Sequence, residues 1–357
     1  MTRPLQLLSL VTHAPTSIIT RDDTLAFLPR LAGGREAAEH FRGTVERSQI
    51  ETRHVETPLD VVERLGTAAR SRIYERRLPE VAEELGRRAL DAAGIRGREV
   101  SAVVTVSCTG YMLPSVDAYI MPRLGISAHA RRVPVTELGC SAGVAAIGLA
   151  AELLQVRSGH ALVISIELCS SCMQTENVAP SDVIGNILFA DAAAAAVVGH
   201  ASSRPGPEIL ATRTVLWPDT TDALGMWLSD TGLRLVLSPE LPMIVRDRLE
   251  PTVNGFLESH GVCRSNIAFW VVHPGGPRVL EAIGERLSLS SSDLAPSWEV
   301  WRGYGNVSSA TVFFILEALR ARGPIPEGRL GLMMAFGPGL SCELVLLRAG
   351  GWLSDAR

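Results

Sequence analysis

The sequence of 357 residues contains no lysine, so all 34 of its basic residues are arginines. A lysine amine is required for Schiff-base catalysis and for the Walker-type phosphate-binding loop, and the sequence therefore excludes both kinds of site. The formal net charge is −4, which gives no reason to expect binding to nucleic acid. An arginine-preferring, GC-rich genome would explain the missing lysines, but the chemical exclusion does not depend on the cause.

The sequence also has little that would direct it to a membrane or out of the cell. Its first 15 residues have one arginine, a weak apolar run and no cleavage site, which makes a poor signal peptide. No apolar stretch reaches membrane-spanning length without charges or turn residues. We therefore expect a cytoplasmic protein without membrane insertion.

The cysteines do not follow a disulfide or metal-binding pattern. Most of the six lie in apolar stretches such as VVTVSC, which is typical of buried thiols in a reducing cytoplasm. Cys169 and Cys172 have C-x-x-C spacing, but no second pair or nearby histidine completes a zinc site. We expect no bound metal.

What the sequence does contain is typical of a large folded α/β protein. Hydrophobic residues make up 46% and charged residues 20%, with a mean hydropathy of +0.20. Apolar runs predict buried strands, and residues 58 to 94 have a helical pattern of apolar and charged residues. The predicted strands cover residues 4 to 12, 102 to 107, 161 to 168 and 192 to 199.

The clearest break in the chain is the segment ASSRPGPE, residues 201 to 208. We place a boundary there between an N-terminal half, 1–205, and a C-terminal half, 206–357. The segments GCSAGVAAIGLAAELL and GNVSSATVFFILEALR have the same order: a glycine, small residues, then an apolar helix. This similarity predicts that the two halves are copies of one α/β unit.

Three short glycine-rich segments each contain one polar residue of a catalytic type. They are ELGCSAG with Cys140, VVHPGGP with His273, and GYGNVSSAT with Asn306. A cysteine at a helix N-terminus forms a thiolate more readily, a histidine can act as its base, and an asparagine can donate to an oxyanion. Taken singly, each has a structural alternative: a buried cysteine, a strand-end histidine and a helix N-cap asparagine.

Together the segments ELGCSAG, HPGGP, YGNVSSAT and FGPGL resemble the bacterial type III polyketide synthases of the chalcone synthase superfamily. The segments SCTGYMLPS, ELCSSCMQ and LFADAAAAAVVG agree with the resemblance, which covers nearly the whole chain. The alternative is a ketoacyl-ACP synthase III-like enzyme that performs a single condensation. That family shares the fold and a Cys-His-Asn set but usually contains a His-Gln-Ala-Asn stretch.

The resemblance implies a thiolase-like fold with two pseudo-repeated αβαβα layered halves, working as a homodimer. It implies an acyltransferase without a cofactor, whose substrates are an acyl-CoA starter and malonyl-CoA. Cys140 would carry the growing chain, and His273 and Asn306 would stabilise the enolate formed when malonyl-CoA loses carbon dioxide. His273 would also help to keep Cys140 ionised.

The resemblance also implies residues that line the substrate pocket, each of which could instead be ordinary core. The pocket positions are Phe189 as a gating aromatic, Cys108, Thr109, Cys169, Cys172, Met226, Leu235 and Ser308. Arg42, Arg47 and Arg53 lie in FRGTVERSQIETRH, near which the family places basic residues that bind CoA phosphates; Arg47 is the best match, and arginine suits that contact. Arg278, just after HPGGP, could also face the CoA entrance. A solvated helix face is the alternative.

Some positions depart from the plant pattern. Ala190 and Ala192 replace two glycines, so the backbone must avoid positive φ there. Leu235 replaces a second gating aromatic, and Met226 replaces a glycine. These changes argue against a plant-like aromatic starter and leave open a tetrahydroxynaphthalene, an alkylpyrone or an alkylresorcinol as the product.

Overall fold

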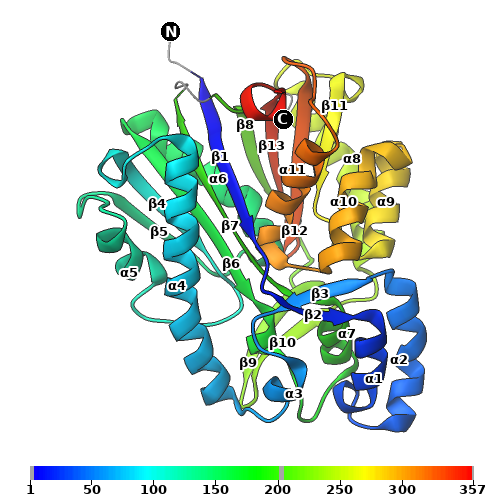
Figure 1. Cartoon of the computed structure of the whole chain (residues 1–357). Helices are drawn as coiled ribbons and strands as arrows, with labels where there is room; N and C mark the ends of the chain where they lie inside the picture. The colour runs from blue at the N-terminus through cyan, green and yellow to red at the C-terminus, as the bar shows by residue number, and fades with distance from the viewer. Residues whose placement is uncertain (1–3, 201–204, 356–357) are drawn as a thin grey trace.

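One nine-stranded sheet runs through the molecule and takes strands from both halves of the sequence (Figure 1). The computed structural model describes residues 4–200 and 205–355, so residues 201–204 of the predicted break lie outside the described residues. The strands follow the order β11-β12-β13-β8-β1-β7-β6-β4-β5. Their bounds are β1 (Leu5–His13), β4 (Val100–Val106), β5 (Arg131–Val135), β6 (His160–Leu168), β7 (Asp191–His200), β8 (Glu208–Leu216), β11 (Ile267–Val272), β12 (Leu330–Gly337) and β13 (Ser341–Arg348).

The sheet repeats one arrangement of four strands. In the first half, β1, β7, β6 and β4 lie side by side, and their pairings are antiparallel, antiparallel and parallel. In the second half, β8, β13, β12 and β11 lie side by side with the same three pairings. The two sets meet where β1 pairs with β8. The duplicated α/β unit predicted from the sequence is therefore present in the topology.

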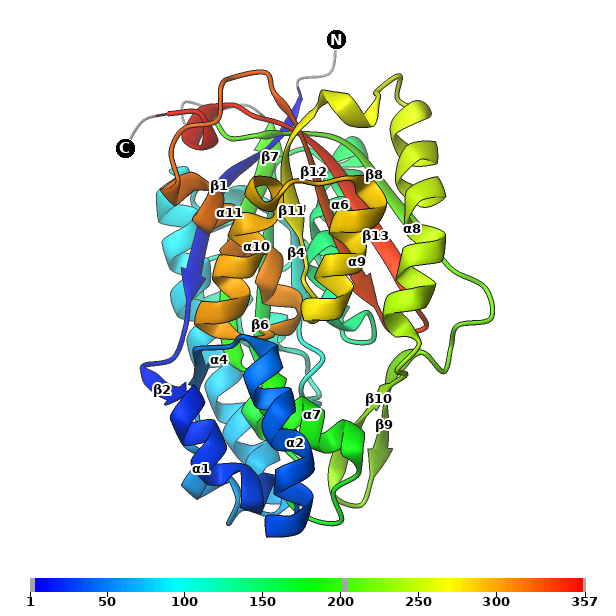
Figure 2. The same cartoon turned by 90° about the vertical axis from the view of Figure 1, so that its right-hand side faces the viewer.

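Helices cover the sheet in layers. The helices α4 (Thr67–Ala93) and α5 (Val116–Arg123) form one outer layer against the first half. The helices α6 (Ala142–Val156) and α11 (Thr311–Ala321) form the middle layer, where both halves of the sheet contribute to one core. The helices α8 (Leu241–Glu258) and α9 (Pro277–Leu287) form the other outer layer, turned toward the viewer in Figure 2. The result is the αβαβα, thiolase-like α/β fold.

The middle helix α6 explains an unusual apolar segment. Residues Gly139–Val156 have the length and the mean hydropathy, 1.5 over 18 residues, of a membrane span. Because the helix packs against strands of both halves, 67% of this segment is buried inside the protein. A helix that is apolar over most of its surface is expected at the centre of a large fold, and Gly139–Val156 is such a core helix, with its polar residues Glu152 and Gln155 exposed near its end.

A smaller group of elements lies beyond one end of the sheet (Figures 1 and 2). It contains two small two-stranded sheets that are separate from the main sheet, together with several helices. The small sheets are β2 (Ser17–Thr20) with β3 (Thr52–Val55) and the hairpin β9 (Leu224–Ser229) with β10 (Gly232–Leu237). The helices are α1 (Arg21–Leu31), α2 (Arg35–Ser48), α3 (Leu59–Val62) and α7 (Pro180–Leu188). The helix α10 (Ser291–Tyr304) packs against α11.

The predicted strands are all present, and their bounds differ from the expected ones by one or two residues. The helical pattern predicted over residues 58 to 94 is confirmed but is divided into α3 and α4. The division falls before Gly66, which is the N-cap of α4. Glycine is a poor residue for a helix interior, and the helix begins after it.

Candidate active site

Cys140 lies in the short turn η2 (Gly139–Ser141), which leads directly into α6. Gly139 has φ of +51°, and a Cβ at this position would lie 2.6 Å from Cδ of Pro338. Only glycine fits such a turn without strain, which explains the small residue before the cysteine. The half-buried Cys140 faces the cavity at the N-terminal end of α6, where the helix dipole favours a thiolate.

Asn306 and Ser308 lie beside this thiol. The Sγ of Cys140 is 3.9 Å from Oδ1 of Asn306 and 3.8 Å from Oγ of Ser308. The backbone N–H of Ser308 donates to Oδ1 of Asn306 at 2.9 Å, although Ser308 has φ of +50°. Ser308 begins the turn η5 (Ser308–Ala310), which leads into α11 as η2 leads into α6. The fold therefore brings together Cys140 and Asn306, which are 166 positions apart in the sequence.

His273 follows the last residue of β11 and is held by its backbone N–H, which donates to Met334 O at 3.0 Å. Its side chain is almost fully buried, and neither Nδ1 nor Nε2 has a hydrogen-bond partner among the described residues. Burial lowers the pKa of His273 to about 4, so its imidazole is neutral above that pH. Within the described part of the chain, no hydrogen bond joins His273 to Cys140, and the histidine is not among the residues that line the cavity.

The surroundings of Cys140 act on its pKa in two directions. Burial raises the pKa of the thiol to about 12, and the hydrogen bonds to Ser308 and Asn306 oppose that rise. The positive end of α6 acts in the same direction as the hydrogen bonds. Cys140 and His273 are thus both neutral when each is considered alone, and attack by the sulfur requires that a nearby base take its proton.

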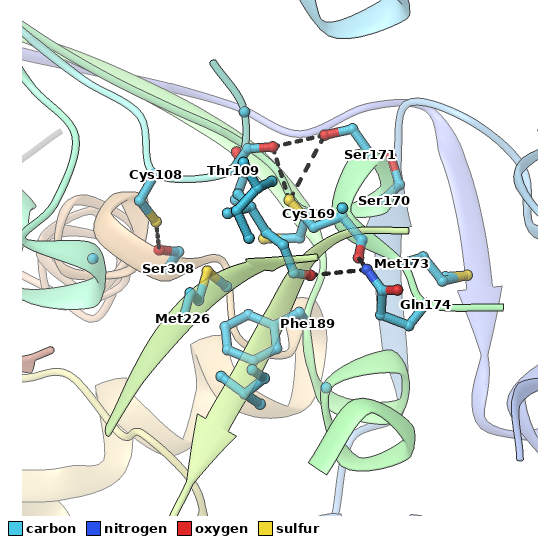
Figure 3. A pocket seen from close by; sticks show the side chains of 18 of the residues that line it. Cys108, Thr109, Cys169, Ser170, Ser171, Met173, Gln174, Phe189, Met226 and Ser308 are labelled. Atoms are coloured by element: carbon cyan, nitrogen blue, oxygen red, sulfur yellow. Dashed lines mark hydrogen bonds between the residues drawn. The ribbon is translucent and has the colours of Figure 1, made fainter. Parts of the chain in front are cut away.

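A cavity of about 480 Å³ opens in front of Cys140, a size typical of sites for small molecules. All eight pocket residues predicted from the sequence line it: Cys108, Thr109, Cys169, Cys172, Phe189, Met226, Leu235 and Ser308. Figure 3 shows most of them, with the Sγ of Cys108 3.3 Å from the Oγ of Ser308. The sequence analysis missed several further lining residues, including Tyr74, Gln174 and Leu228.

A buried carboxyl group behind the cavity wall was also missed. Glu167, in β6, accepts hydrogen bonds from the N–H of Cys108 at 3.0 Å, from Oγ1 of Thr109 at 3.0 Å and from Oγ of Ser308 at 3.3 Å. It also accepts from Ser309, and burial raises the pKa of Glu167. The carboxyl group ties the 108–109 loop to the turn that follows Asn306. Its only signal in the sequence was a single charge inside the apolar strand ISIEL.

Phe189 is fixed by backbone contacts with the asparagine. Phe189 and Asn306 form a parallel β-bridge, in which the N–H of Asn306 donates to Leu188 O at 2.8 Å and the N–H of Ala190 donates to Asn306 O at 3.0 Å. Neither Ala190 nor Ala192 has positive φ, as expected from the replacement of glycine. Backbone pairing therefore joins the gating position to the asparagine.

Arg53 does not lie at an entrance for CoA, and that expectation is wrong. The side chain is buried, and its guanidinium donates to Asn186 O at 2.7 Å and to Phe189 O at 2.8 Å. A third hydrogen bond goes to Oγ1 of Thr24 at 3.1 Å. Arginine can satisfy three acceptors at once, and here it holds the end of α7 that carries Phe189.

The other three arginines are on the surface. Arg42 and Arg47 are exposed on α2, and Arg42 lies 3.4 Å from a carboxylate oxygen of Glu39. Arg278 is exposed in the first turn of α9. None of the three is among the residues that line the cavity, and their contact with a substrate stays a prediction.

Comparisons with known proteins agree on the family. Residues 8–202 match the N-terminal domain, and residues 208–350 the C-terminal domain, of chalcone and stilbene synthases. The chain is 37% identical over 305 residues to 1,3,6,8-tetrahydroxynaphthalene synthase of Streptomyces peucetius subsp. caesius, covering 84% of this chain and 81% of that protein. It is 29% identical over 353 residues to an alpha-pyrone synthesis polyketide synthase-like protein of Mycobacterium tuberculosis, covering 94% and 89%.

A solved structure agrees as well. The crystal structure of 1,3,6,8-tetrahydroxynaphthalene synthase from Streptomyces coelicolor A3(2), a bacterial type III polyketide synthase, matches with a TM-score of 0.92 and 29% identity. The match covers 98% of this chain and 100% of the other. The alternative of a ketoacyl-ACP synthase III is not supported. The chain belongs to the chalcone and stilbene synthase family and is a type III polyketide synthase, an acyltransferase.

Proposed function

We propose that this enzyme extends an acyl group on Cys140 with successive two-carbon units from malonyl-CoA. The observation that carries the proposal is the position of the Cys140 thiol, which opens on a cavity of about 480 Å³ with Asn306 and Ser308 within 4 Å of its sulfur. A nucleophile, amide and hydroxyl groups and a cavity that can hold the growing chain are what repeated acyl transfer requires.

In the first step, the sulfur of Cys140 attacks the thioester carbonyl of the starter acyl-CoA. His273 accepts the thiol proton, and the bond from the carbonyl carbon to the CoA sulfur breaks. The proton then leaves with CoA as a free thiol. The unpartnered nitrogens of His273 support this role because a neutral imidazole has one acceptor and one donor available.

In the second step, malonyl-CoA loses carbon dioxide, and the electron pair of the broken carbon–carbon bond becomes an enolate. Donors from His273 and Asn306 stabilise the enolate oxygen, an oxyanion-type stabilisation. The enolate carbon attacks the acyl carbonyl on Cys140, and the cysteine leaves as a thiolate. Transfer of the longer chain from CoA back to Cys140 starts the next round.

We propose malonyl-CoA as both starter and extender, with a tetrahydroxynaphthalene-type pentaketide as the product. The support is the similarity to three relatives named 1,3,6,8-tetrahydroxynaphthalene synthase, which are 31% to 37% identical to this chain. An alkylpyrone or alkylresorcinol from a fatty acyl starter is the second candidate. It is supported by the relative named for alpha-pyrone synthesis and by the apolar side chains of Met226 and Leu235 on the cavity wall.

The test is mass spectrometry of products from the purified enzyme with malonyl-CoA, with and without a series of fatty acyl-CoA starters. A pentaketide from malonyl-CoA alone supports the first candidate. Products that appear only with fatty acyl-CoA, and whose mass rises with the starter, support the second. Addition of a single malonyl unit under every condition would contradict iterative condensation.

Two variants test the assigned residues. Cys140→Ala should abolish condensation while the protein stays folded, because no sulfur remains to carry the chain. Asn306→Ala should slow decarboxylation of malonyl-CoA by about 10²–10³-fold, the usual effect of losing one oxyanion donor. Product formation by Cys140→Ala, or an unchanged decarboxylation rate in Asn306→Ala, would remove the corresponding role.

We further propose that the enzyme is a cytoplasmic homodimer that needs no cofactor and has halves divided near residues 205 and 206. All six cysteines are free thiols, which suits a reducing compartment. Arg47, Arg42 and Arg278 would bind the phosphates of CoA, because the guanidinium group pairs with phosphate through two parallel hydrogen bonds. Their exposure leaves them accessible for that contact.

A further inference from the structure

The hairpin β9–β10 forms one wall of the cavity but has no place in the main sheet. Its two strands pair only with each other among the described strands. Met226, Leu228, Leu233 and Leu235 of this hairpin line the cavity. A two-stranded hairpin is at best marginally stable alone, so contacts with the rest of the chain must fix the wall.

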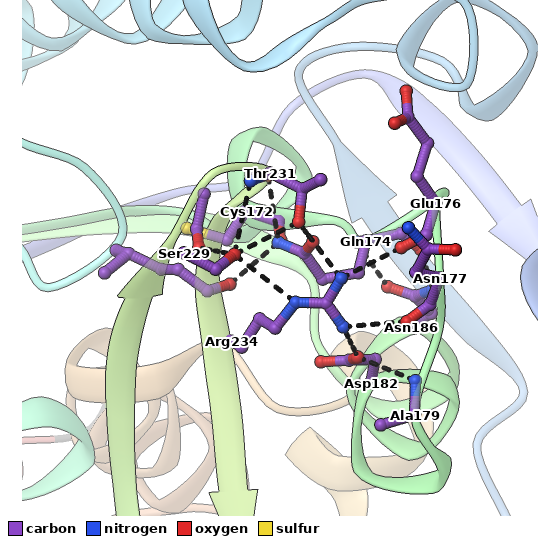
Figure 4. A network of polar contacts seen from close by, with 12 residues as sticks. Cys172, Gln174, Glu176, Asn177, Ala179, Asp182, Asn186, Ser229, Thr231 and Arg234 are labelled. Atoms are coloured by element: carbon purple, nitrogen blue, oxygen red, sulfur yellow. Dashed lines mark hydrogen bonds and ion pairs between the residues drawn. The ribbon is translucent and has the colours of Figure 1, made fainter.

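Arg234 joins this hairpin to the first turn of α7 and to the segment before it (Figure 4). Its guanidinium lies 2.6 Å from Oδ2 of Asp182 and donates to Asn177 O and Glu176 O, each at 3.0 Å. The side chains of Arg234 and Asp182 are 11% and 1% exposed. Asp182 is itself fixed in the first turn of α7, where its Oδ2 accepts from the N–H of Ala179 at 2.9 Å.

The loop of the hairpin is tied by a second group of hydrogen bonds. Arg234 donates to Oγ1 of Thr231 at 3.1 Å, and Oγ1 of Thr231 donates to Oε1 of Gln174 at 2.8 Å. The amide nitrogen of Gln174 donates to Leu233 O at 2.9 Å, and Arg70 of α4 donates to Thr231 O at 3.1 Å. Oδ1 of Asp182 and Nε of Arg70 have no partner among the described residues, but the other hydrogen bonds tie the loop to two separate segments of the chain.

We propose that the Arg234–Asp182 pair is a positioning element that fixes the β9–β10 wall and thereby limits how many units the growing chain can gain. The inference rests on the proposed function, because the wall acts on a chain held at Cys140. Removing one member of a buried ion pair leaves the other charge unpaired. The hairpin then loses its fixed distance from α7, and the cavity loses its fixed width.

The position of the hairpin can be tested without activity, by hydrogen–deuterium exchange of the full-length protein. In the Arg234→Gln variant, the backbone amides of residues 224–237 should exchange about tenfold faster than in the parent, while those of β6 and β12 exchange at the parent rate. Thr231→Val, which removes only hydroxyl contacts and preserves side-chain shape, should have a smaller effect in the same place. Unchanged exchange of the hairpin in both variants would overturn the anchoring.

The effect on chain length is tested by the ratio of products that differ by one malonyl unit. This ratio should change by about tenfold in Arg234→Gln and in Asp182→Asn, and the double variant should match the singles because the pair acts as one unit. Decarboxylation of malonyl-CoA should stay at the parent rate. Arg264→Gln is the matched control. The guanidinium of Arg264 lies 3.2 Å from a carboxylate oxygen of Glu250, and neither residue lines the cavity.

An unchanged product ratio with a loosened hairpin would overturn the link to chain length. A parent enzyme that makes no polyketide would instead contradict the proposed function, while the exchange measurement would still decide whether the pair anchors the wall.

Discussion

His273 combines deep burial with two ring nitrogens that have no hydrogen-bond partner in the described part of the chain. Leaving a buried polar atom unpaired costs about 1–3 kcal/mol, so such a side chain destabilises the unliganded fold. In the proposed mechanism, its imidazole nitrogens would bind a substrate carbonyl or accept the proton of Cys140. The neutral form is also the one that can both donate and accept.

The lowered pKa of His273 predicts a specific dependence of stability on pH. The folded-state pKa is about 4, against 6.5 for the unperturbed group. Between these values the unfolded chain binds a proton that the folded chain does not, so the free energy of unfolding falls as the pH is lowered. From pH 7 to pH 5 this residue should remove about 2 kcal/mol of stability. His273→Gln should lose that share of the pH dependence in urea unfolding.

His129→Gln, which changes an exposed histidine, is the control and should keep the parent's pH dependence. Burial raises the pKa of Asp191 to about 6 and that of Glu343 to about 7, which gives contributions of the opposite sign. The parent and both histidine variants contain Asp191 and Glu343, so the contributions of these two residues cancel in the comparison. An equal dependence on pH in His273→Gln and the parent would contradict the neutral, buried state of the ring.

At the scale of elements, the site depends on how closely α6 approaches the turn η5. A Cβ added to Gly143, one turn after Cys140, would lie 2.1 Å from the backbone oxygen of Ser309. Gly148 is in the same helix, but its added Cβ would make only ordinary contact, 3.4 Å from Cβ of Thr212. Only glycine therefore fits at position 143, whereas position 148 has room for an alanine.

We expect Gly143→Ala to destabilise the protein by about 1–3 kcal/mol, as overpacking in a core does. It should also reduce condensation, because Ser309 adjoins Ser308 beside the thiol. Gly148→Ala is the matched control and should be neutral or stabilising, by up to about 1 kcal/mol from helix propensity. Thermal unfolding measures the stability of both variants, and product yield measures their condensation activity. Equal stability of the two variants would contradict the close approach of α6 and η5.

Apolar periodicity predicted the strands and the small-residue helix starts because these elements are buried and their residue types follow from burial. The prediction failed for Arg53, because a charged residue in a polar segment gives no sign that its partners are backbone carbonyls of Asn186 and Phe189. Glu167 was missed for a similar reason. Its partners come from two segments, 108–109 and 308–309, that are far apart in the sequence, and only the fold brings them together.

At the scale of the molecule, the site belongs to neither half alone. Cys140 comes from the first half, while Asn306 and His273 come from the second, and one core contains strands of both. The distance of 3.9 Å between Cys140 and Asn306 thus depends on the packing of α6 with α11. The similar segments GCSAG and GNVSS are the two turns that lead into α6 and α11, and they are the sequence feature that corresponds to this arrangement.

The single chain also leaves large apolar side chains of the 111–119 segment exposed. Tyr111 and Leu113 are 73% and 80% exposed, and Tyr119 lies close by in sequence with 38% of its surface exposed. Adjacent large apolar side chains in water are typical of an interaction surface. In the proposed homodimer, this 111–119 segment would be covered by the second subunit.

Leu113→Asp should therefore weaken the dimer, because a carboxylate would have to be buried at the interface without a partner. In sedimentation velocity, the parent should be a dimer and the variant should shift toward monomer at micromolar concentration. Leu216→Asp is the matched control, since Leu216 is also 65% exposed but lies at the end of β8, and that variant should remain dimeric. A fully dimeric Leu113→Asp protein, or a monomeric parent, would contradict the assignment of this segment to the interface.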